Sequence, residues 1–231
     1  MPQIAKEAYF TNLRDGDQIE MPFKLSFGLS GWWGLAPISK PLTGKSGHHH
    51  LLVNRDLPLD FKTALPFNDQ YMHFGKGQME GVLNLPPGAY KLRLLLADDK
   101  HIPHFIYSKQ MSITVLRQNK NVTPESLIQK GIKLLSPAAG VKVKAPFRVQ
   151  FHASGFNVAH QVQQVKDTGH FRLTVIPQHG GKPVDLLFPN GQTETWLSPP
   201  TGAYKLKLDL LDNLNPAKTL AETLPTDILV E

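Results

Sequence analysis

Hydrophobic residues alternate with polar ones along several short stretches of the chain. The alternation runs through residues 23–29, 90–96 and 171–175, where Phe, Tyr, Leu or Val occupies every second position. Because successive side chains of a β-strand point to opposite faces, this period of two predicts strands with one buried face. Proline and glycine interrupt the pattern at short intervals, and no long stretch has the period of an amphipathic helix. We therefore expect an all-β protein.

The second half of the chain repeats the first. Similar segments recur in the same order and with approximately the same spacing, which indicates a tandem duplication of one domain. The corresponding segments are GDQIEMPFKLSFGLSG (16–31) and GVKVKAPFRVQFHASG (140–155), GHHHLLV (47–53) and GHFRLTV (169–175), and GQMEGVLNLPPGAYKLRLLLAD (77–98) and GQTETWLSPPTGAYKLKLDLLD (191–212).

The boundary between the two copies is expected in the polar segment RQNKNVTPESLIQKG at 117–131. Thr123, which is followed by Pro and Glu, has the sequence of an N-cap before the first turn of a short helix. The predicted organisation is a histidine-rich, metal-binding first domain at 1–117, a linker with a short helical turn at 118–131, and a degenerate second copy at 132–231 that serves as scaffold or docking module.

A tyrosine motif indicates the type of sandwich. LNLPPGAYKL (83–92) and LSPPTGAYKL (197–206) resemble the tyrosine corner of immunoglobulin-like domains. In that corner, a tyrosine entering strand F hydrogen-bonds to the backbone of the preceding turn, so Tyr90 and Tyr204 are expected to be structural. The predicted fold is two tandem immunoglobulin-like antiparallel β-sandwich domains that arose by internal duplication.

The composition excludes several classes of function. Hydrophobic residues make up 41% of the 231 residues, enough for packed cores, and the lack of cysteine excludes disulfides, thiolate ligands and a cysteine nucleophile. The formal net charge of +6 comes from scattered lysines and arginines, without a dense basic stripe or a nucleic-acid motif. No apolar stretch has the length of a membrane span. We expect neither nucleic-acid binding nor a membrane span.

The two copies differ most in their histidines. Residues that both copies share are expected to serve the fold, as for Glu80 and Asp98, which recur in the second copy as Glu194 and Asp212. Residues present in only one copy need another explanation. Five histidines of the first copy are candidate metal ligands, and the second copy keeps only the counterpart of the first of them: His48, His50, His73, His101 and His104.

Strand parity separates the three consecutive histidines at 48–50. Residues 171–175 of the second copy should direct their first, third and fifth side chains into the core, and the same parity directs His49 inward in the first copy. We expect His49 to be buried with its ring hydrogen-bonded to the backbone. His48 and His50 should then project together from the opposite face.

The strand order of an immunoglobulin-like sandwich predicts that the candidate ligands meet. The B–C, D–E and F–G connections of that fold share one end. His48 and His50 begin strand C at this end, and His73 lies just before strand E. His101 and His104 follow strand F in the F–G loop. Converging neutral imidazoles are ligands for transition metals, so we predict a metal site, with a histidine-rich hydrogen-bonding rim as the alternative.

The donor types favour copper. An all-imidazole set without thiolate should bind copper(II) most tightly, with zinc as the alternative. HIPH (101–104) resembles the paired-ligand loops of metal sites, with a proline stiffening the chain between the donors. Met72 is next to His73 and offers a thioether for copper(I), although adjacent strand residues face opposite ways and core filling is the alternative for the methionines.

Two other interpretations stay open. Trp32 and Trp33 lie in the predicted B–C loop, where they shield the site, plug the sandwich end, or form a stacking platform for a sugar or peptide. In the last case the protein is a metal-free module that recognises a polysaccharide or an envelope protein. A metallohydrolase would need a carboxylate base, for which Asp99 is the available acid. No G-x-S-x-G, phosphate-loop or H-E-x-x-H motif is present, so we do not expect an enzyme.

The motifs GHHHLLV, HFGKGQME and GAYKLRLLLADDKHIPH resemble a family of small exported bacterial β-domains, known as a domain of unknown function. The resemblance covers the first copy from about Tyr9 to Leu116. Met79 stands where the G-Q-T-E motif of the family has threonine, and the second copy keeps GQTE but lacks the histidines. The resemblance implies a periplasmic location. Because MPQIAKEAYF lacks the apolar core of a secretory signal, it also implies that a signal peptide has been removed.

These observations combine into one expectation. The first domain of a periplasmic two-domain protein binds a transition metal, copper or alternatively zinc, for storage, delivery or sensing. The second domain acts as scaffold or as a docking module for an envelope protein.

Overall fold

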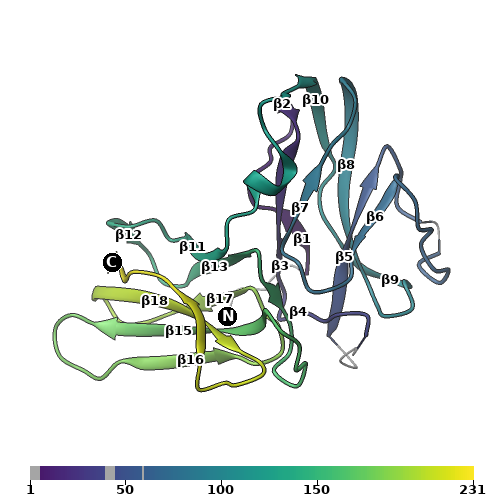
Figure 1. The fold of residues 1–231 in the computed structure, drawn as a ribbon. Coiled ribbons are helices and arrows are strands. Elements are labelled where there is room, and N and C mark those ends of the chain that lie inside the picture. The colour runs from purple at the N-terminus through teal and green to yellow at the C-terminus, as the bar shows by residue number, and fades with distance from the viewer. Residues whose placement is uncertain (1–5, 40–44, 59) are drawn as a thin grey trace.

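The computed structural model describes residues 6–39, 45–58 and 60–231, which form two β-sandwiches (Figure 1). The strands of the first repeat are β1 (Ala8–Phe10), β2 (Gln18–Met21), β3 (Phe23–Leu29), β4 (Gly34–Leu35), β5 (Ser46–Val53), β6 (Tyr71–Phe74), β7 (Glu80–Leu83), β8 (Gly88–Ala97), β9 (Pro103–Tyr107) and β10 (Met111–Gln118). The strands of the second repeat are β11 (Gly131–Ser136), β12 (Val141–Val143), β13 (Phe147–Ser154), β14 (Asn157–Val158), β15 (Thr168–Pro177), β16 (Val184–Phe188), β17 (Glu194–Leu197), β18 (Gly202–Asp212), β19 (Thr219–Glu222) and β20 (Thr226–Val230).

The two repeats have the same sheet topology. In the first repeat, a small sheet has the order β1-β3-β7 and a large sheet the order β2-β10-β8-β5-β4, with β6 beside β5 and β9 beside β8. The second repeat follows with β11-β13-β17 and β12-β20-β18-β15-β14, and β16 and β19 take the places of β6 and β9. Pairing is antiparallel except where β2, β4, β12 and β14 join their sheets in parallel. The predicted duplication and sandwich fold are confirmed.

The alternating hydrophobic residues meet between the two sheets of each repeat. In the first repeat, Phe27 of β3, Leu51 of β5 and Leu94 of β8 are completely buried in this core. Each such side chain stabilises the fold by roughly 1.5–3 kcal/mol through the surface it removes from water. Phe151 and Phe171 occupy the corresponding core of the second repeat, with ring centroids 5.2 Å apart. The period of two therefore located the core correctly.

Both tyrosine corners are present. The Tyr90 hydroxyl donates to the carbonyl oxygen of Pro86 at 2.9 Å, and the Tyr204 hydroxyl donates to that of Pro200 at the same distance. Each bond fixes the turn before β8 or β18 to the strand that follows it. The structural role predicted for both tyrosines is confirmed.

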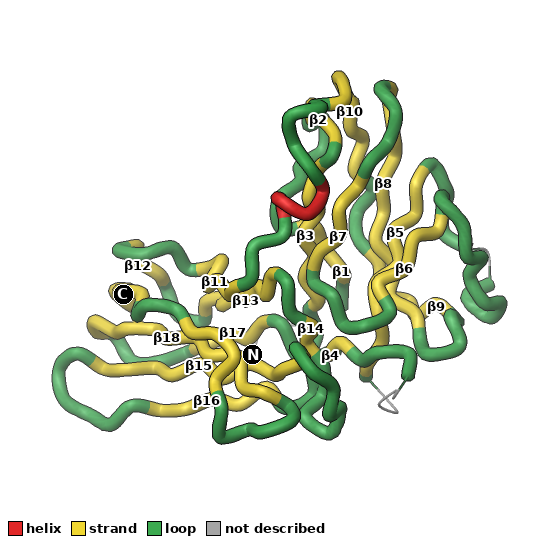
Figure 2. Tube along the Cα trace, viewed as in Figure 1, coloured by secondary structure: helices red, strands yellow, loops and turns green. Residues whose placement is uncertain are grey.

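The segment between the repeats contains one short helix, Pro124–Leu127, drawn in red in Figure 2. It is a 3₁₀-helix with Thr123 at its N-cap position, as predicted, but the Thr123 side chain makes no capping hydrogen bond. The Thr123 carbonyl oxygen instead accepts bonds from Ser126, from its backbone N–H at 3.1 Å and from its hydroxyl at 2.7 Å. A tight turn with i to i+3 bonding satisfies these groups without a cap.

Two buried glutamates connect the repeats. Glu80 of β7 accepts hydrogen bonds from the Ser154 hydroxyl at 2.7 Å, the Gly155 N–H at 3.0 Å and His152 Nε2 at 3.1 Å, all in the other repeat. Burial by itself raises the pKa of Glu80, but these hydrogen bonds outweigh it and hold the pKa below its usual value. The counterpart Glu194 accepts a bond from the Tyr9 hydroxyl at 2.7 Å. The scaffold role predicted for Glu80 thus takes the form of a contact between the repeats.

Replacing Glu80 by glutamine should lower the free energy of unfolding by about 1.5–3 kcal/mol at pH 7, because hydrogen bonds to the carboxylate are charge-assisted. Since the folded state lowers the pKa of Glu80, its contribution is complete above the ordinary value of 4.5 and is lost as the pH falls through the folded value. Urea denaturation at pH 7 and pH 4 should show the gap between wild type and Glu80→Gln narrowing in acid. Glu125→Gln, at an exposed position, should show no such gap.

Candidate metal centre

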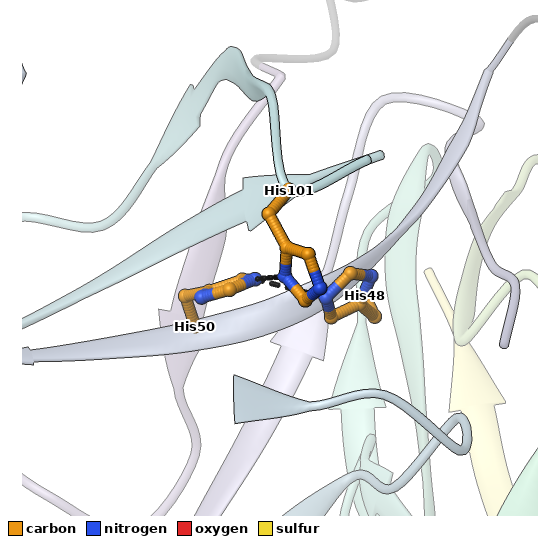
Figure 3. Close-up of side chains that lie close together, drawn as sticks. All are labelled: His48, His50 and His101. Carbon is orange, nitrogen blue, oxygen red and sulfur yellow. Dashed lines mark hydrogen bonds between the residues drawn. The ribbon is translucent and has the colours of Figure 1, made fainter. Parts of the chain in front are cut away.

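Three imidazole rings of the first repeat point toward one another, two from β5 and one from the loop between β8 and β9 (Figure 3). His48 Nε2 lies 2.8 Å from His50 Nε2, and His101 Nδ1 lies 3.4 Å from His50 Nε2. One ring nitrogen from each histidine falls within 4.8 Å of the other two. We call His48, His50 and His101 the histidine triad.

The alternation of β5 places two members of the triad. His49 contacts Phe27 of the core, with ring centroids 5.4 Å apart, and His48 and His50 lie on the opposite face of the strand. The predicted parity is confirmed. That second face is also covered, because His48 and His50 are 0% exposed.

An aspartate shapes the loop that carries the third member. Asp98 Oδ1 accepts hydrogen bonds from the backbone N–H groups of Lys100 at 2.9 Å and Ile102 at 2.8 Å. The Asp98 carbonyl oxygen accepts a bond from the N–H of His101, which has a left-handed φ of 62°. A short polar side chain that bonds to the backbone two residues on stabilises such a turn. Its counterpart Asp212 accepts the equivalent bond from Leu214.

His73 joins the cluster by a route that we did not predict. We expected it in the connection before strand E, but it lies on β6, which pairs with β5 so that His73 is directly opposite His50. Its ring centroid is 6.0 Å from that of His48, 5.8 Å from that of His50 and 5.4 Å from that of His101. His73 is therefore a fourth imidazole at the edge of the triad.

His104 does not converge with the other four. Its Nε2 donates to the carbonyl oxygen of Ser46 at 3.2 Å, and its ring packs on Trp33 with centroids 4.7 Å apart. The prediction that all five histidines meet is therefore wrong at His104. The reason is that β9 begins at Pro103 and pairs with β8. His104 is therefore part of a strand and lies apart from His101, which is in the loop.

His49 corrects a second expectation. It is buried as predicted, but among the described residues neither of its ring nitrogens has a hydrogen-bond partner. Burial lowers the pKa of His49 to about 3, so the ring is neutral at pH 7. The backbone of β5 cannot satisfy this ring, because its N–H and C=O groups are already paired with β8 and β6.

The surroundings of His48 and His50 keep their rings neutral. Burial, followed by repulsion from the neighbouring histidines, lowers the pKa of His48 to about 3 and that of His50 to about 2. Burial and His101 also lower the pKa of His73. A neutral imidazole has a lone pair on one nitrogen, which is the form that binds metals. At pH 7 the rings of His48 and His50 are therefore in the protonation state that a ligand requires.

The spacing of the nitrogens matches that of ligands to one ion. Two nitrogens bound at about 2.0–2.1 Å are about 2.9 Å apart at a right angle and about 3.4 Å apart at the tetrahedral angle. The separations of His50 Nε2 from His48 Nε2 and from His101 Nδ1 are 2.8 and 3.4 Å. Little movement would bring all three onto one ion.

The surroundings of the triad are aromatic. The ring of Phe67 lies 4.3 Å from that of His73, and Trp33 covers His104. Trp32 is 52% exposed and has a left-handed φ of 65°. Met72 packs against the hydrophobic core, and Asp99 does not belong to the ligand group that the described residues form.

The second repeat fills the same place with hydrogen-bonded polar groups. Arg172, the counterpart of His50, donates to the buried carboxylate of Asp209 at 2.8 Å. His170, the counterpart of His48, donates from Nδ1 to Asn213 Oδ1 at 2.7 Å. In the first repeat, by contrast, Nδ1 of His48 and Nδ1 of His50 have no partner among the described residues. The same backbone therefore supports an ion pair and a hydrogen-bonded histidine in one repeat, and three converging imidazoles in the other, two of which keep an unpartnered Nδ1.

A family model described as Domain of unknown function (DUF4399) matches residues 25–116 and 149–229. These two regions make up most of the chain, so the chain belongs to this family. The resemblance inferred for the first copy is thus confirmed, and it extends to the second. No curated protein matches the chain in sequence.

Several solved structures similar to the chain contain fibronectin type III modules. The fibronectin(III)-like modules of CbhA from Clostridium thermocellum share 10% identity, with 96% of this chain and 92% of that chain covered and a TM-score of 0.30. A two-domain fibronectin type III segment of chicken tenascin shares 13% identity, with 98% of both chains covered and a TM-score of 0.25. TM-scores of this size support no inference about function. Within the described ranges, no helix is long and apolar enough to cross a membrane.

Replacing His49 by leucine should raise the free energy of unfolding of the metal-free protein by about 1–3 kcal/mol, because a buried polar group without partners destabilises the fold by that amount. Urea denaturation of chelator-treated protein measures the difference. Leu51→Ala, at the next inward position of β5, should lower the same quantity by about 2–5 kcal/mol and serves as control. A clear loss of stability in His49→Leu would contradict the assignment of His49 as unpartnered.

Proposed function

We propose that this member of the DUF4399 family binds a transition metal ion through His48, His50 and His101. The observation that carries the proposal is the convergence of three ring nitrogens at the spacing of ligands to one ion, two of them on the buried, neutral rings of His48 and His50. His73 completes the site as a fourth imidazole from β6. Three or four imidazoles are the ligand number that tetrahedral and square-planar ions require.

The fold does not need this cluster, which supports a functional reason for it. The second repeat builds the same strands with Arg172 paired to Asp209 in the equivalent place. Nδ1 of His48 and Nδ1 of His50 are buried without partners among the described residues, which lowers stability, and residues that lower stability are typical of a functional site. A metal ion bound by the two Nε2 atoms and by His101 Nδ1 would offset this loss.

The donor set favours copper(II) over zinc, because affinity among divalent ions peaks at copper when imidazole is the ligand. The ligand group formed by the described residues contains no carboxylate that would serve as a general base next to the metal. We therefore propose storage, delivery or sensing of the metal in the periplasm, and not catalysis, with an envelope protein as the partner that receives or supplies the ion.

The exposed Trp32 supports the second candidate function. An indole ring that is 52% exposed offers a stacking surface to a sugar or a peptide. In this second hypothesis the protein is a metal-free module that recognises a polysaccharide or an envelope protein through Trp32, and the histidines only form hydrogen bonds at the edge of that surface. Variants of Trp32 and of the histidine triad distinguish the two functions.

Calorimetric titration of copper(II) into metal-stripped protein should show one site tighter than micromolar, with zinc bound more weakly. His50→Ala and His101→Ala each remove a ligand and should weaken copper binding by at least about tenfold. His104→Ala and His49→Leu are matched controls, since both lie beside the triad without joining it, and they should bind copper as wild type does. Equal binding by all five proteins would contradict the proposal.

Copper should also stabilise the fold by mass action. At a free copper concentration about 100 times the dissociation constant, the free energy of unfolding should rise by about 2.7 kcal/mol. Thermal unfolding of wild type with and without copper measures this shift. His50→Ala should show a shift near zero, whereas Trp32→Ala should keep the full shift if the metal and not the indole carries the function.

A further inference from the structure

The second repeat holds the strand that carries His48 and His50. Strand β4 pairs with the start of β5, Gly34 opposite Ser46 and Leu35 opposite Gly47. On the other side of β4, the Leu35 N–H donates to the carbonyl oxygen of Gly191 at 2.8 Å, and Gly34 forms a β-bridge with Gln192. We call this contact the β4 clasp; β4 lies at the junction of the two repeats in Figure 1.

A matching contact holds the turn that follows His73. The carbonyl oxygen of Gly77 accepts a bond from the Val158 N–H of β14 at 2.8 Å, and Gln78 forms a β-bridge with Asn157. We call this contact the β14 clasp. Gly77 in the first repeat and Gly191 in the second are counterparts, and the carbonyl oxygen of each accepts a backbone hydrogen bond from the other repeat.

The segment after β4 joins the two clasps to the ligand strands. The Ala36 N–H donates to the carbonyl oxygen of Gly47 at 2.9 Å, one residue before His48. The Ile38 N–H donates to the carbonyl oxygen of Gly75 at 3.0 Å, two residues after His73. A shift of the second repeat would therefore move both ligand strands at their ends.

The β4 clasp leaves no room for a side chain. A Cβ atom added to Gly191 would lie 2.3 Å from the carbonyl oxygen of Leu35, far inside van der Waals contact. Gly191 also has a left-handed φ of 76°. The clasp is thus a close approach of two backbones that only glycine permits at this point.

We infer that the second repeat is a positioning module for the metal centre, with Gly191 as a positioning residue that acts on His48 through β4. This inference rests on the proposed metal binding. It assigns the role of the second repeat: its backbone fixes the ends of β5 and β6, so that the imidazoles they carry keep the spacing of one ion. Ligands held on braced elements bind more tightly than ligands that must be ordered on binding.

The full chain with Gly191→Ala tests the inference against Gly180→Ala. Gly180 has a nearly equal φ of 75°, but a Cβ there meets nothing within 4 Å, so the control matches the backbone strain without the clash. We expect Gly191→Ala to weaken copper(II) affinity about tenfold or more and to change the visible and electron paramagnetic spectra of the copper-saturated protein. Gly180→Ala should leave both as in wild type. Far-UV circular dichroism verifies that both variants fold.

A second measurement uses wild type alone. Coupling between two sites is reciprocal, so if the clasps position the ligands, copper binding must stabilise the clasps. Hydrogen exchange of the Leu35 and Val158 amides should slow about tenfold on copper binding, whereas the Gln178 amide, bonded to Ala203 within the second repeat, should not change. If wild type binds neither copper nor zinc, the metal function and this inference both fail. If wild type binds copper and Gly191→Ala matches it in affinity and spectrum, or the clasp amides exchange unchanged, only the positioning role is wrong.

Discussion

The candidate site depends on the alternation of side chains along β5, a strand buried on both faces. Its inward face places His49 against Phe27 in the core, and its other face places His48 and His50 beside the loop of His101. Because β8 and β6 pair with both edges of this strand, its register is fixed, and a slip of one residue would exchange the two faces. The spacing of His48 and His50 is therefore a property of the sheet, whereas His101 is placed by the loop that Asp98 shapes.

The duplication shows what the fold requires and what it tolerates. Both repeats keep a tyrosine corner, a glutamate at the junction and an aspartate that shapes the turn after strand F. In the place of the histidine triad, however, the second repeat has the ion pair of Arg172 with Asp209. Arg172 is matched there by an opposite charge at hydrogen-bond distance, whereas the buried Nδ1 atoms of His48 and His50 have no partner among the described residues. The two repeats thus share their sheet topology and differ in the side chains at this place.

The sequence predicted features that depend on local geometry better than features that depend on contacts between distant segments of the chain. Period-two alternation and the internal repeat depend on local geometry, and they predicted the core, the parity of His49 and the convergence of His50 with His101. The pairing of β6 with β5 could not be predicted, because four residues around His73 carry too little pattern to show a strand. The direction of His104 depends on β9 pairing back onto β8, and the clasps depend on backbone contacts that leave no trace in hydrophobicity.

The shared G-Q-x-E segment connects these observations. Sequence comparison of the two copies assigned it to the fold, and in the structure its glycine and glutamate contact the other repeat, Gly191 through Leu35 and Glu80 through Ser154. The segment serves each repeat only when the other is present, because the partners of these groups lie across the junction. A chain that keeps a second repeat without the histidines is therefore consistent with selection for the contact itself. The repeat that lacks the histidine triad retains the residues that contact its neighbour.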